Sequence, residues 1–336
     1  MTPLVLAQEV SADTTAPTDG LKVIQEVAFC LSIENYTCAT EILNGLEDRD
    51  NAEWNRLVDV LKATFFLSRA LDLGDSSDVD HYLQAHHRAE KSIETSDAPQ
   101  SNGLLFLLDG TLLATHAQYF NEFLDKPLKA IGPAEHSADA MEKALDLNPD
   151  FEGARVSLAL YRFWHSHVLR SLAWTPFVAD RREESLAILR TIANSESPYR
   201  VSAAIGMSWA LVEMGRSLEG AALADSMRTA LGEELRGLLE PAGKGYYLAG
   251  RWEPARQRYD SLLVSLRHAP HRSLVREIGV LNRLAHIARE QGDWQAVLQY
   301  TDDALSLPMS QEQAERKHDD LKRLRELQHQ AGLELE

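Results

Sequence analysis

The chain has 336 residues, 44% hydrophobic and 25% charged, a composition typical of folded proteins that excludes global disorder. Asp and Glu number 51 against 34 Lys and Arg, so a formal charge of -17 repels phosphate backbones and anionic lipid headgroups and argues against nucleic acid as a partner. The acidic excess also keeps a long chain soluble, and that explanation is the simpler one.

The chain opens on a short apolar run, Met1–Gln8, whose end Val5-Leu6-Ala7 has the small-residue pattern that precedes signal-peptidase cleavage. Two interpretations stay open, because the run lacks a basic start. It is either the tail of a longer export signal followed by a disordered leader to residue 20, or the irregular N-terminus of a cytoplasmic protein. The first predicts a periplasmic or cell-envelope location in a bacterium.

Apolar residues spaced three and four apart predict helices over 21–34 and 37–48, joined by a tight turn. The two cysteines of the chain, Cys30 and Cys38, lie on either side of this turn. A disulfide between them is geometrically possible and suits an exported protein, while two free thiols buried between helices explain the pair equally well. Neither cysteine has further metal ligands beside it, so no zinc or other metal site is predicted.

No stretch of the sequence approaches the roughly 18 consecutive apolar residues of a membrane span. The same spacing predicts six further helix pairs and a last helix. The pairs are 52–72 with 78–95, 102–124 with 135–147, 150–170 with 180–195, 199–214 with 217–231, 235–250 with 252–267, and 272–291 with 294–306, followed by 311–333. Pro241 should start or kink its helix. The last helix is mostly charged, as expected of a helix that caps an array.

One pattern recurs in the C-terminal half. A helical stretch ends at Gly, an aromatic residue follows two positions later, and a small or branched residue comes three after that. These positions are Gly250, Trp252 and Ala255 in one copy and Gly292, Trp294 and Val297 in another. Gly215 starts a third copy with Ser217 in place of the aromatic residue, and the three glycines are 35 and 42 residues apart.

The complementary half of the repeat appears at Ala140, Ala144, Leu147 and Pro149, followed by Leu158-Ala159. With these motifs the chain resembles the tetratricopeptide repeat family. The resemblance implies an all-α solenoid, a right-handed superhelix of about seven helical hairpins with a capping helix over 309–336. Recognisable repeats cover 135–308, and 21–134 contains degenerate hairpins that match mainly in periodicity.

Sequence signatures of catalysis and of cofactor binding are missing. Among the histidines no pair brackets a Glu at helical zinc-protease spacing, and no Gly-rich phosphate loop occurs. We therefore predict a protein without catalytic residues, metal or cofactor of its own. The exception left open is a site assembled by His165, His167 and the aromatic segment that follows them.

In the tetratricopeptide repeat family, which this chain resembles, the first helices of successive hairpins line a concave groove that contacts partners. Continuing the repeat frame along this chain gives an aromatic stretch that passes into a basic and amide patch. Its residues are Trp164, Trp209, Lys244, Tyr247, Asn282, His286 and Arg289. Each of them is equally explained as a core or surface residue. Trp174 and Phe177, in the linker over 171–180, form a second candidate site that docks a partner or covers the groove.

The leading hypothesis is accordingly a scaffold whose groove binds a protein or peptide. A small-solute binding component of an exported bacterial system is the alternative. Partner identity and oligomeric state are not encoded in any recognisable motif.

Overall fold

The computed structural model describes residues 16–46, 51–96, 103–169, 179–232 and 235–336. Within these ranges the chain forms α-helices and one π-helix, and no strand. The prediction of an all-helical protein is confirmed. The first elements are α1 (Ala16–Ser32), α2 (Tyr36–Gly45), α3 (Ala52–Leu73), α4 (Ser76–Glu94), α5 (Gly103–Gln118), η1 (Tyr119–Phe123) and α6 (Pro127–Leu147).

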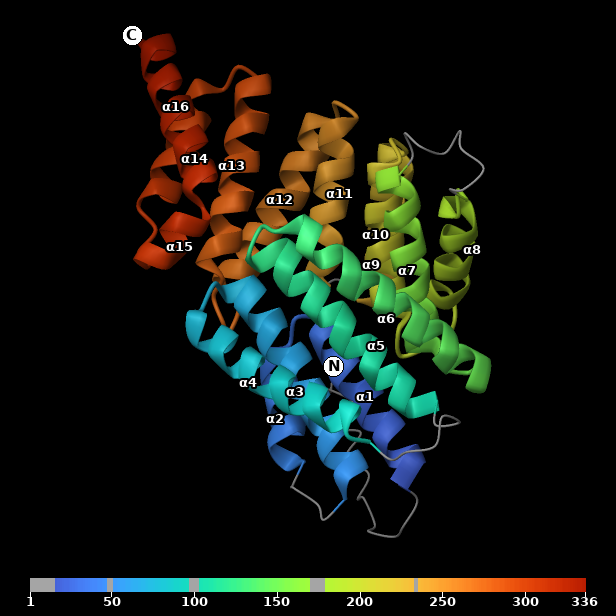
Figure 1. Ribbon diagram of the computed structural model, residues 1–336. Coiled ribbons are helices and arrows are strands. Elements are labelled where there is room, and N and C mark those ends of the chain that lie inside the picture. Colours follow the sequence, from blue (N-terminus) through green and yellow to red (C-terminus); the bar gives the residue numbers. More distant parts are fainter. Residues whose placement is uncertain (1–15, 47–50, 97–102, 170–178, 233–234) are drawn as a thin grey trace, which may run out of the picture.

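The later elements continue the pairing of antiparallel helices. They are α7 (Glu152–Val168), α8 (Arg182–Ala193), α9 (Arg200–Glu213), α10 (Ser217–Leu231), α11 (Arg236–Leu248), α12 (Trp252–Arg267), α13 (Leu274–Glu290), α14 (Trp294–Leu305), α15 (Gln311–Arg316) and α16 (His318–Leu335). Figure 1 shows α7 to α14 as a row of hairpins, with α16 covering its far end. The array is a solenoid of stacked hairpins with a C-terminal capping helix, as the sequence predicts.

Several elements differ from their predictions, and α1 already begins at Ala16, inside the stretch predicted as a disordered leader. α6 begins at Pro127 instead of residue 135, because proline is favoured in the first helical turn, where its missing N–H is not needed. It therefore runs through the expected boundary at 134/135. α11 begins at Arg236, next to its predicted start, so Pro241 lies inside the helix and does not start it. The last helix is divided at Lys317 into α15 and α16.

Glycines in the left-handed conformation end the first helix of three hairpins, as the repeat pattern predicts. Gly215, Gly250 and Gly292 have φ angles of 82°, 67° and 72°. After Gly215, the N–H of Arg216 donates to the carbonyl of Leu211 at 2.9 Å, which satisfies one of the carbonyls left unpaired at the helix end. This geometry reverses the chain into the second helix of each hairpin.

The two ends of the described array contact each other through a group of charged residues, which we call the closure cluster: Glu34, Asp72, Arg236 and Arg276. Arg276 on α13 lies with Nη1 2.6 Å from the Glu34 carboxylate and 3.2 Å from that of Asp72. Arg236 on α11 lies 3.3 Å from the Glu34 carboxylate and also donates to the Glu34 carbonyl at 3.1 Å. Side chains of Glu34, Asp72 and Arg276 are less than one-fifth exposed, so the cluster joins residues more than 200 positions apart inside the protein.

Glu34 adopts a positive φ of 56°, a conformation that favours glycine. It follows the C-terminus of α1, where the Asn35 N–H donates to the Cys30 carbonyl at 2.9 Å. A glycine here would end the helix with less strain, but it would have no carboxylate for Arg236 and Arg276. The local cost at Glu34 is therefore offset by the long-range contact.

The C-terminal end of α3 is held by residues from the other end of the array. The carbonyl of Ala70 accepts from Arg316 at 3.1 Å, and that of Leu73 accepts from Gln313 Nε2 at 2.9 Å. Ser273 Oγ donates to the Asp72 carbonyl. The last carbonyls of a helix have no partners within it and attract cations, so α13 and α15 complete the capping of α3.

The first helix lies on the inner side of the array. Leu21 and Ile24 pack against the apolar core of α5, α6 and α7, whereas Ala28 and the following Ile33 pack against the core of α7 to α11. α1 also contacts α3 and α9 (Figure 1). Part of the expected concave surface is thus covered by the chain's own N-terminal helix.

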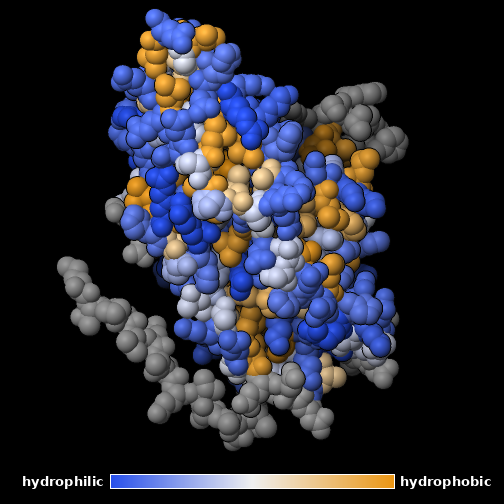
Figure 2. Space-filling view, turned by 90° about the vertical axis from the view of Figure 1, so that its left-hand side faces the viewer, coloured by the Kyte–Doolittle hydropathy of each residue, from blue (hydrophilic) through white to orange (hydrophobic). Residues whose placement is uncertain are grey.

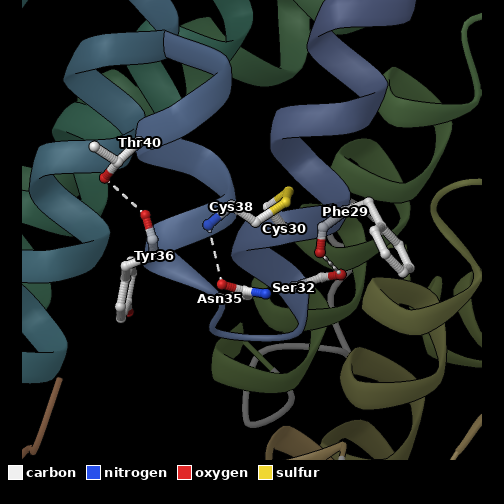
Figure 3. Close-up of a disulfide and its surroundings, with 7 residues drawn as sticks. All are labelled: Phe29, Cys30, Ser32, Asn35, Tyr36, Cys38 and Thr40. Atoms are coloured by element: carbon white, nitrogen blue, oxygen red, sulfur yellow. Dashed lines mark hydrogen bonds between the residues drawn. A yellow bond between two sulfur atoms is a disulfide. The ribbon is translucent and has the colours of Figure 1, made fainter. Parts of the chain in front are cut away.

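A disulfide joins Cys30 of α1 to Cys38 of α2, with their Cα atoms 5.8 Å apart (Figure 3). The side-chain oxygen of Asn35 accepts from the Cys38 N–H at 3.0 Å and caps α2. Of the two states that the sequence leaves open for these cysteines, the structure contains the cross-linked one. The link holds α1 and α2 together next to Glu34.

We expect Gly245→Ala to destabilise the protein by about 2 kcal/mol, because its Cβ would lie 2.5 Å from the Ser217 carbonyl oxygen of α10. The same substitution at Gly279, which has no atom within 4 Å of the added Cβ, should instead stabilise helix α13 by up to about 1 kcal/mol. Urea midpoints followed by circular dichroism compare the two. Equal shifts of the same sign would contradict this account of the α10–α11 contact.

Arg276→Met should destabilise the protein by about 3 kcal/mol, since it leaves the buried carboxylate of Asp72 without its cation and leaves Glu34 with Arg236 alone. Arg216→Met is the matched control, because Arg216 pairs at the surface with Glu183 and Glu219 and should cost less than about 1 kcal/mol. The thermal midpoints of both variants give the comparison. A loss for Arg276→Met no larger than that for the control would show that the closure cluster does not hold the two ends together.

Candidate functional site

The predicted groove residues do not form one continuous open surface. Trp209 of α9 and Lys244 of α11 come together, with the Lys244 ammonium 5.0 Å from the centre of the indole ring. The same ammonium lies 2.6 Å from the Glu213 carboxylate. This cation–π contact and ion pair make a local cluster whose polar groups already have partners.

The C-terminal members of the predicted groove contact neighbouring helices. Asn282 is buried and donates to Asp320 of α16 at 2.9 Å, and Tyr247 packs edge-on against Trp252 at 5.4 Å. Burial and the nearby Arg289 guanidinium, followed by Arg283 and Arg323, lower the pKa of His286. Arg289 itself pairs with Glu290 at 2.6 Å. The capping helix thus covers part of this stretch, which the repeat frame could not reveal.

Trp164 differs from the other predicted residues, because its side chain is 38% exposed and borders open space. Two adjoining cavities of about 430 and 460 Å³ lie between the end of α5, η1, the start of α6 and the second half of α7. We call them together the Trp164 cleft. Lining residues common to both cavities are Asn121, Ala130, Ala134, Tyr161 and Trp164.

Small side chains on three helices create this cleft. Ala114 and Ala117 of α5, Ala130 and Ala134 of α6, and Ser157 of α7 line it. These residues leave unfilled the space that larger side chains would occupy. The π-helix η1 then ends α5 with a wider turn and places Asn121 at the edge of the cleft.

Large apolar side chains surround the cleft and remain exposed. Leu128 and Ile131 of α6 are 83% and 51% exposed, and Val168 of α7 is 71% exposed. Ile131, Trp164 and Val168 line the cleft and form its apolar rim, and Leu128 lies one helical turn before Ile131 on α6. Scattered exposed apolar residues are normal, whereas a group gathered around a concave site indicates a binding surface. Leu128 and Ile131 are not among the predicted site residues, because the predicted helix starts after them. Pro127, a residue favoured in the first helical turn, is the signal that indicates the earlier start.

A cluster of aromatic rings and histidines supports η1. Tyr82 OH lies 2.9 Å from His116 Nδ1, and the rings of His86 and His116 are 4.3 Å apart. The ring of Tyr119 lies 5.1 Å from that of Tyr82. Burial, reinforced by His116 and His87, lowers the pKa of His86 to about 4. His86 is therefore neutral at pH 7, where the cluster is packed without a buried charge.

A larger cavity of about 870 Å³ lies where the α1–α2 hairpin meets α11 and the end of α12. Its charged groups are already used, because Glu34 and Arg236 pair with each other. Tyr36 donates to the Ser68 carbonyl at 3.3 Å and packs edge-on against His271. The Trp164 cleft, whose apolar rim is exposed, is the better candidate for a binding site.

The remaining predicted residues are two aromatic residues of the linker and two histidines at the end of α7. Trp174 and Phe177 lie outside the described residues. His165 lines the Trp164 cleft, and His167 stacks on Phe163 with ring centres 5.9 Å apart. Across the ranges that the structure describes, no group of three His, Cys, Asp or Glu side chains is placed to hold a metal ion. In those same ranges, none of the helices combines the length and apolar character needed to cross a bilayer.

Figure 2 shows the side of the molecule on the left of Figure 1. Hydrophilic residues cover most of this face, and the apolar residues on it gather in separate patches. The pattern agrees with the formal charge of -17 and with a protein surface that faces water.

Acid should weaken the support of η1. His86 titrates near 6.5 when unfolded and at about 4 when folded, so its contribution is complete above pH 6.5 and is lost as the pH falls toward 4. Between pH 7 and pH 5 we expect a loss of roughly 1–2 kcal/mol, smaller in His86→Phe, which cannot titrate. His329→Gln, at an exposed position on α16, is the control and should behave like the parent. Thermal midpoints across this pH range test the expectation, and identical curves for parent and His86→Phe would refute it.

No profile of a known protein family matches the sequence, and no curated protein matches it. Among solved structures, the Rap protein complexed with competence and sporulation factor aligns over 94% of this chain and 85% of its own, at a TM-score of 0.54 and 12% identity. A tetratricopeptide repeat protein from Parabacteroides merdae aligns over 92% of this chain and 99% of its own, at a TM-score of 0.45 and 14% identity.

PilW, a type IV pilus biogenesis factor, aligns over 77% of this chain and 97% of its own, at a TM-score of 0.48 and 16% identity. Identities this low establish a likeness of fold alone. This likeness of fold, together with the hairpins and their glycine turns, identifies the fold as a tetratricopeptide-like helical repeat.

Proposed function

We propose that the chain is a non-catalytic scaffold that binds a protein partner, and that the partner docks in the Trp164 cleft. The observation that carries the proposal is the exposed apolar rim of Ile131, Trp164 and Val168 around a cavity lined by small side chains, with the exposed Leu128 one turn away on α6. Burying such a rim against a partner removes apolar surface from water at a gain of about 25 cal/mol per Å². The fold likeness supports the proposal, because the Rap protein was solved in a complex with a separate factor.

The arrangement suits a peptide segment better than a small solute. The cleft follows the junction of α6 and α7, and its two cavities share Tyr161 and Trp164 instead of closing around one compartment. A large side chain of a partner can enter above Ala130 and Ala134 while its neighbours cover Leu128 and Val168. This places a tryptophan at the centre of the contact, where binding energy is commonly concentrated.

The test is selection of peptides of about 15 residues, long enough for four helical turns, from a displayed random library on the parent protein. The selected peptides are then compared on the parent and on the Trp164→Ala variant. We expect peptides that bind the parent and lose about thirtyfold in affinity on Trp164→Ala, the loss typical of a central tryptophan contact. Titration calorimetry on synthetic peptides measures the loss.

Leu128→Ala should weaken the same peptides, whereas Leu248→Ala, an exposed leucine on α11, should not. A Lys244→Ala/Arg289→Ala variant tests the groove predicted from sequence in the same assay. Loss of binding in that variant with retention in Trp164→Ala would assign the partner to the predicted groove instead of the cleft. Retention in all variants would exclude both sites.

A further inference from the structure

The charged residues that line the Trp164 cleft are all acidic. Its lining residues include two carboxylates, Glu122 and Glu135, and no lysine or arginine. Glu122 accepts a hydrogen bond from Gln118 at 3.3 Å, and no ion pair is made by either carboxylate within the described residues. A partner therefore meets apolar walls and uncompensated negative charge in the same site.

Helix α6 extends this charge along one face. Glu135 and Asp139 follow Ile131 at intervals of four residues, so all three lie on the side of α6 that borders the cleft. Both carboxylates are exposed. Lys129 precedes Ile131 by two positions and, at about 100° per residue, lies on the opposite side of the helix. The lysine therefore does not neutralise the cleft.

The pKa of Tyr161 on α7 responds to the same carboxylates of α6. Burial raises the pKa of its hydroxyl, and Glu135, Asp139 and Glu142 raise it further, in that order. Glu142 is paired with Arg162 at 2.9 Å, which leaves Glu135 and Asp139 as the uncompensated acids beside the ring. The acids that act on Tyr161 thus come from α6, and Glu122 of η1 adds a further carboxylate to the lining of the cleft.

These features define the chemistry of an occupant. Apolar side chains suit the space above Ala130 and Ala134. Lysine or arginine side chains suit the carboxylates, and they also interact favourably with the faces of Trp164 and Tyr161. An acidic segment would bring like charges together in a partly water-excluded site, which is unfavourable.

We propose that the Trp164 cleft binds a basic amphipathic segment of a partner protein, with apolar side chains in the cleft and lysine or arginine against Glu122 and Glu135. This inference rests on the proposed function, since it names the chemical class of partner for the same site. Recognition of an amphipathic segment in a groove between helices supplies affinity through the apolar residues and selectivity through the charged ones.

The experiment repeats the library selection on Glu122→Gln/Glu135→Gln and on a matched control, Glu41→Gln/Glu334→Gln. The control removes the same number of charges from exposed positions on α2 and α16. We expect peptides that depend on Trp164 to be enriched in Lys and Arg when selected on the parent or the control. Enrichment should disappear on Glu122→Gln/Glu135→Gln, and the affinity of parent-selected peptides should fall about threefold or more on that variant.

Three results separate the possible failures. Trp164-dependent peptides without enrichment in Lys and Arg would overturn the basic class and leave the docking site intact. Equal losses on the control variant would show attraction to the overall acidic charge and would also overturn it. The absence of any Trp164-dependent peptide would overturn the proposed function and this inference together.

Discussion

Arg276 is the residue on which the shape of the molecule depends. A buried guanidinium needs carboxylate partners, and Arg276 takes them from Glu34 and Asp72, which lie more than 200 positions earlier in the chain. Arg236 binds the carbonyl and the carboxylate of Glu34 from the next hairpin. The helix ends that carry Glu34 and Asp72 are thereby fixed against α11 and α13. An array that stacks only neighbouring hairpins gains a contact between its two ends.

This closure determines which surfaces remain for a partner. With the C-terminal ends of α1 and α3 held against α11 and α13, α1 lies over the inner cores through Leu21, Ile24 and Ala28. The inner face of the first helices is then partly occupied, and α16 covers Asn282 at the far end. The Trp164 cleft lies beside α6 and α7, outside these contacts, and keeps its apolar rim exposed.

The cleft exists because small side chains occupy positions where large ones pack elsewhere in the protein. Alanine and serine on α5, α6 and α7 leave unfilled the space that large residues occupy elsewhere in the cores, while Ile131 and Trp164 line its exposed edge. Glu122 and Glu135 add negative charge without a cation among the lining residues. The buried histidine and tyrosine cluster beneath η1 holds one border of this site through Tyr82 and His116.

Periodicity and turn chemistry in the sequence were sufficient to predict the helical hairpins, because amphipathic spacing and left-handed glycines such as Gly215 act over a few residues. The same local patterns pointed to Trp164, which lines the cleft, but they also grouped it with Asn282, which lies under the capping helix.

The sequence by itself therefore determined the repeat and the position of its turns. Only the tertiary structure decided that Glu34 and Arg276 meet, that α1 lies inside the array, and that Ile131 borders a cleft. The physical reason is that these features depend on contacts between segments far apart in the chain, for which no local pattern of residues carries information.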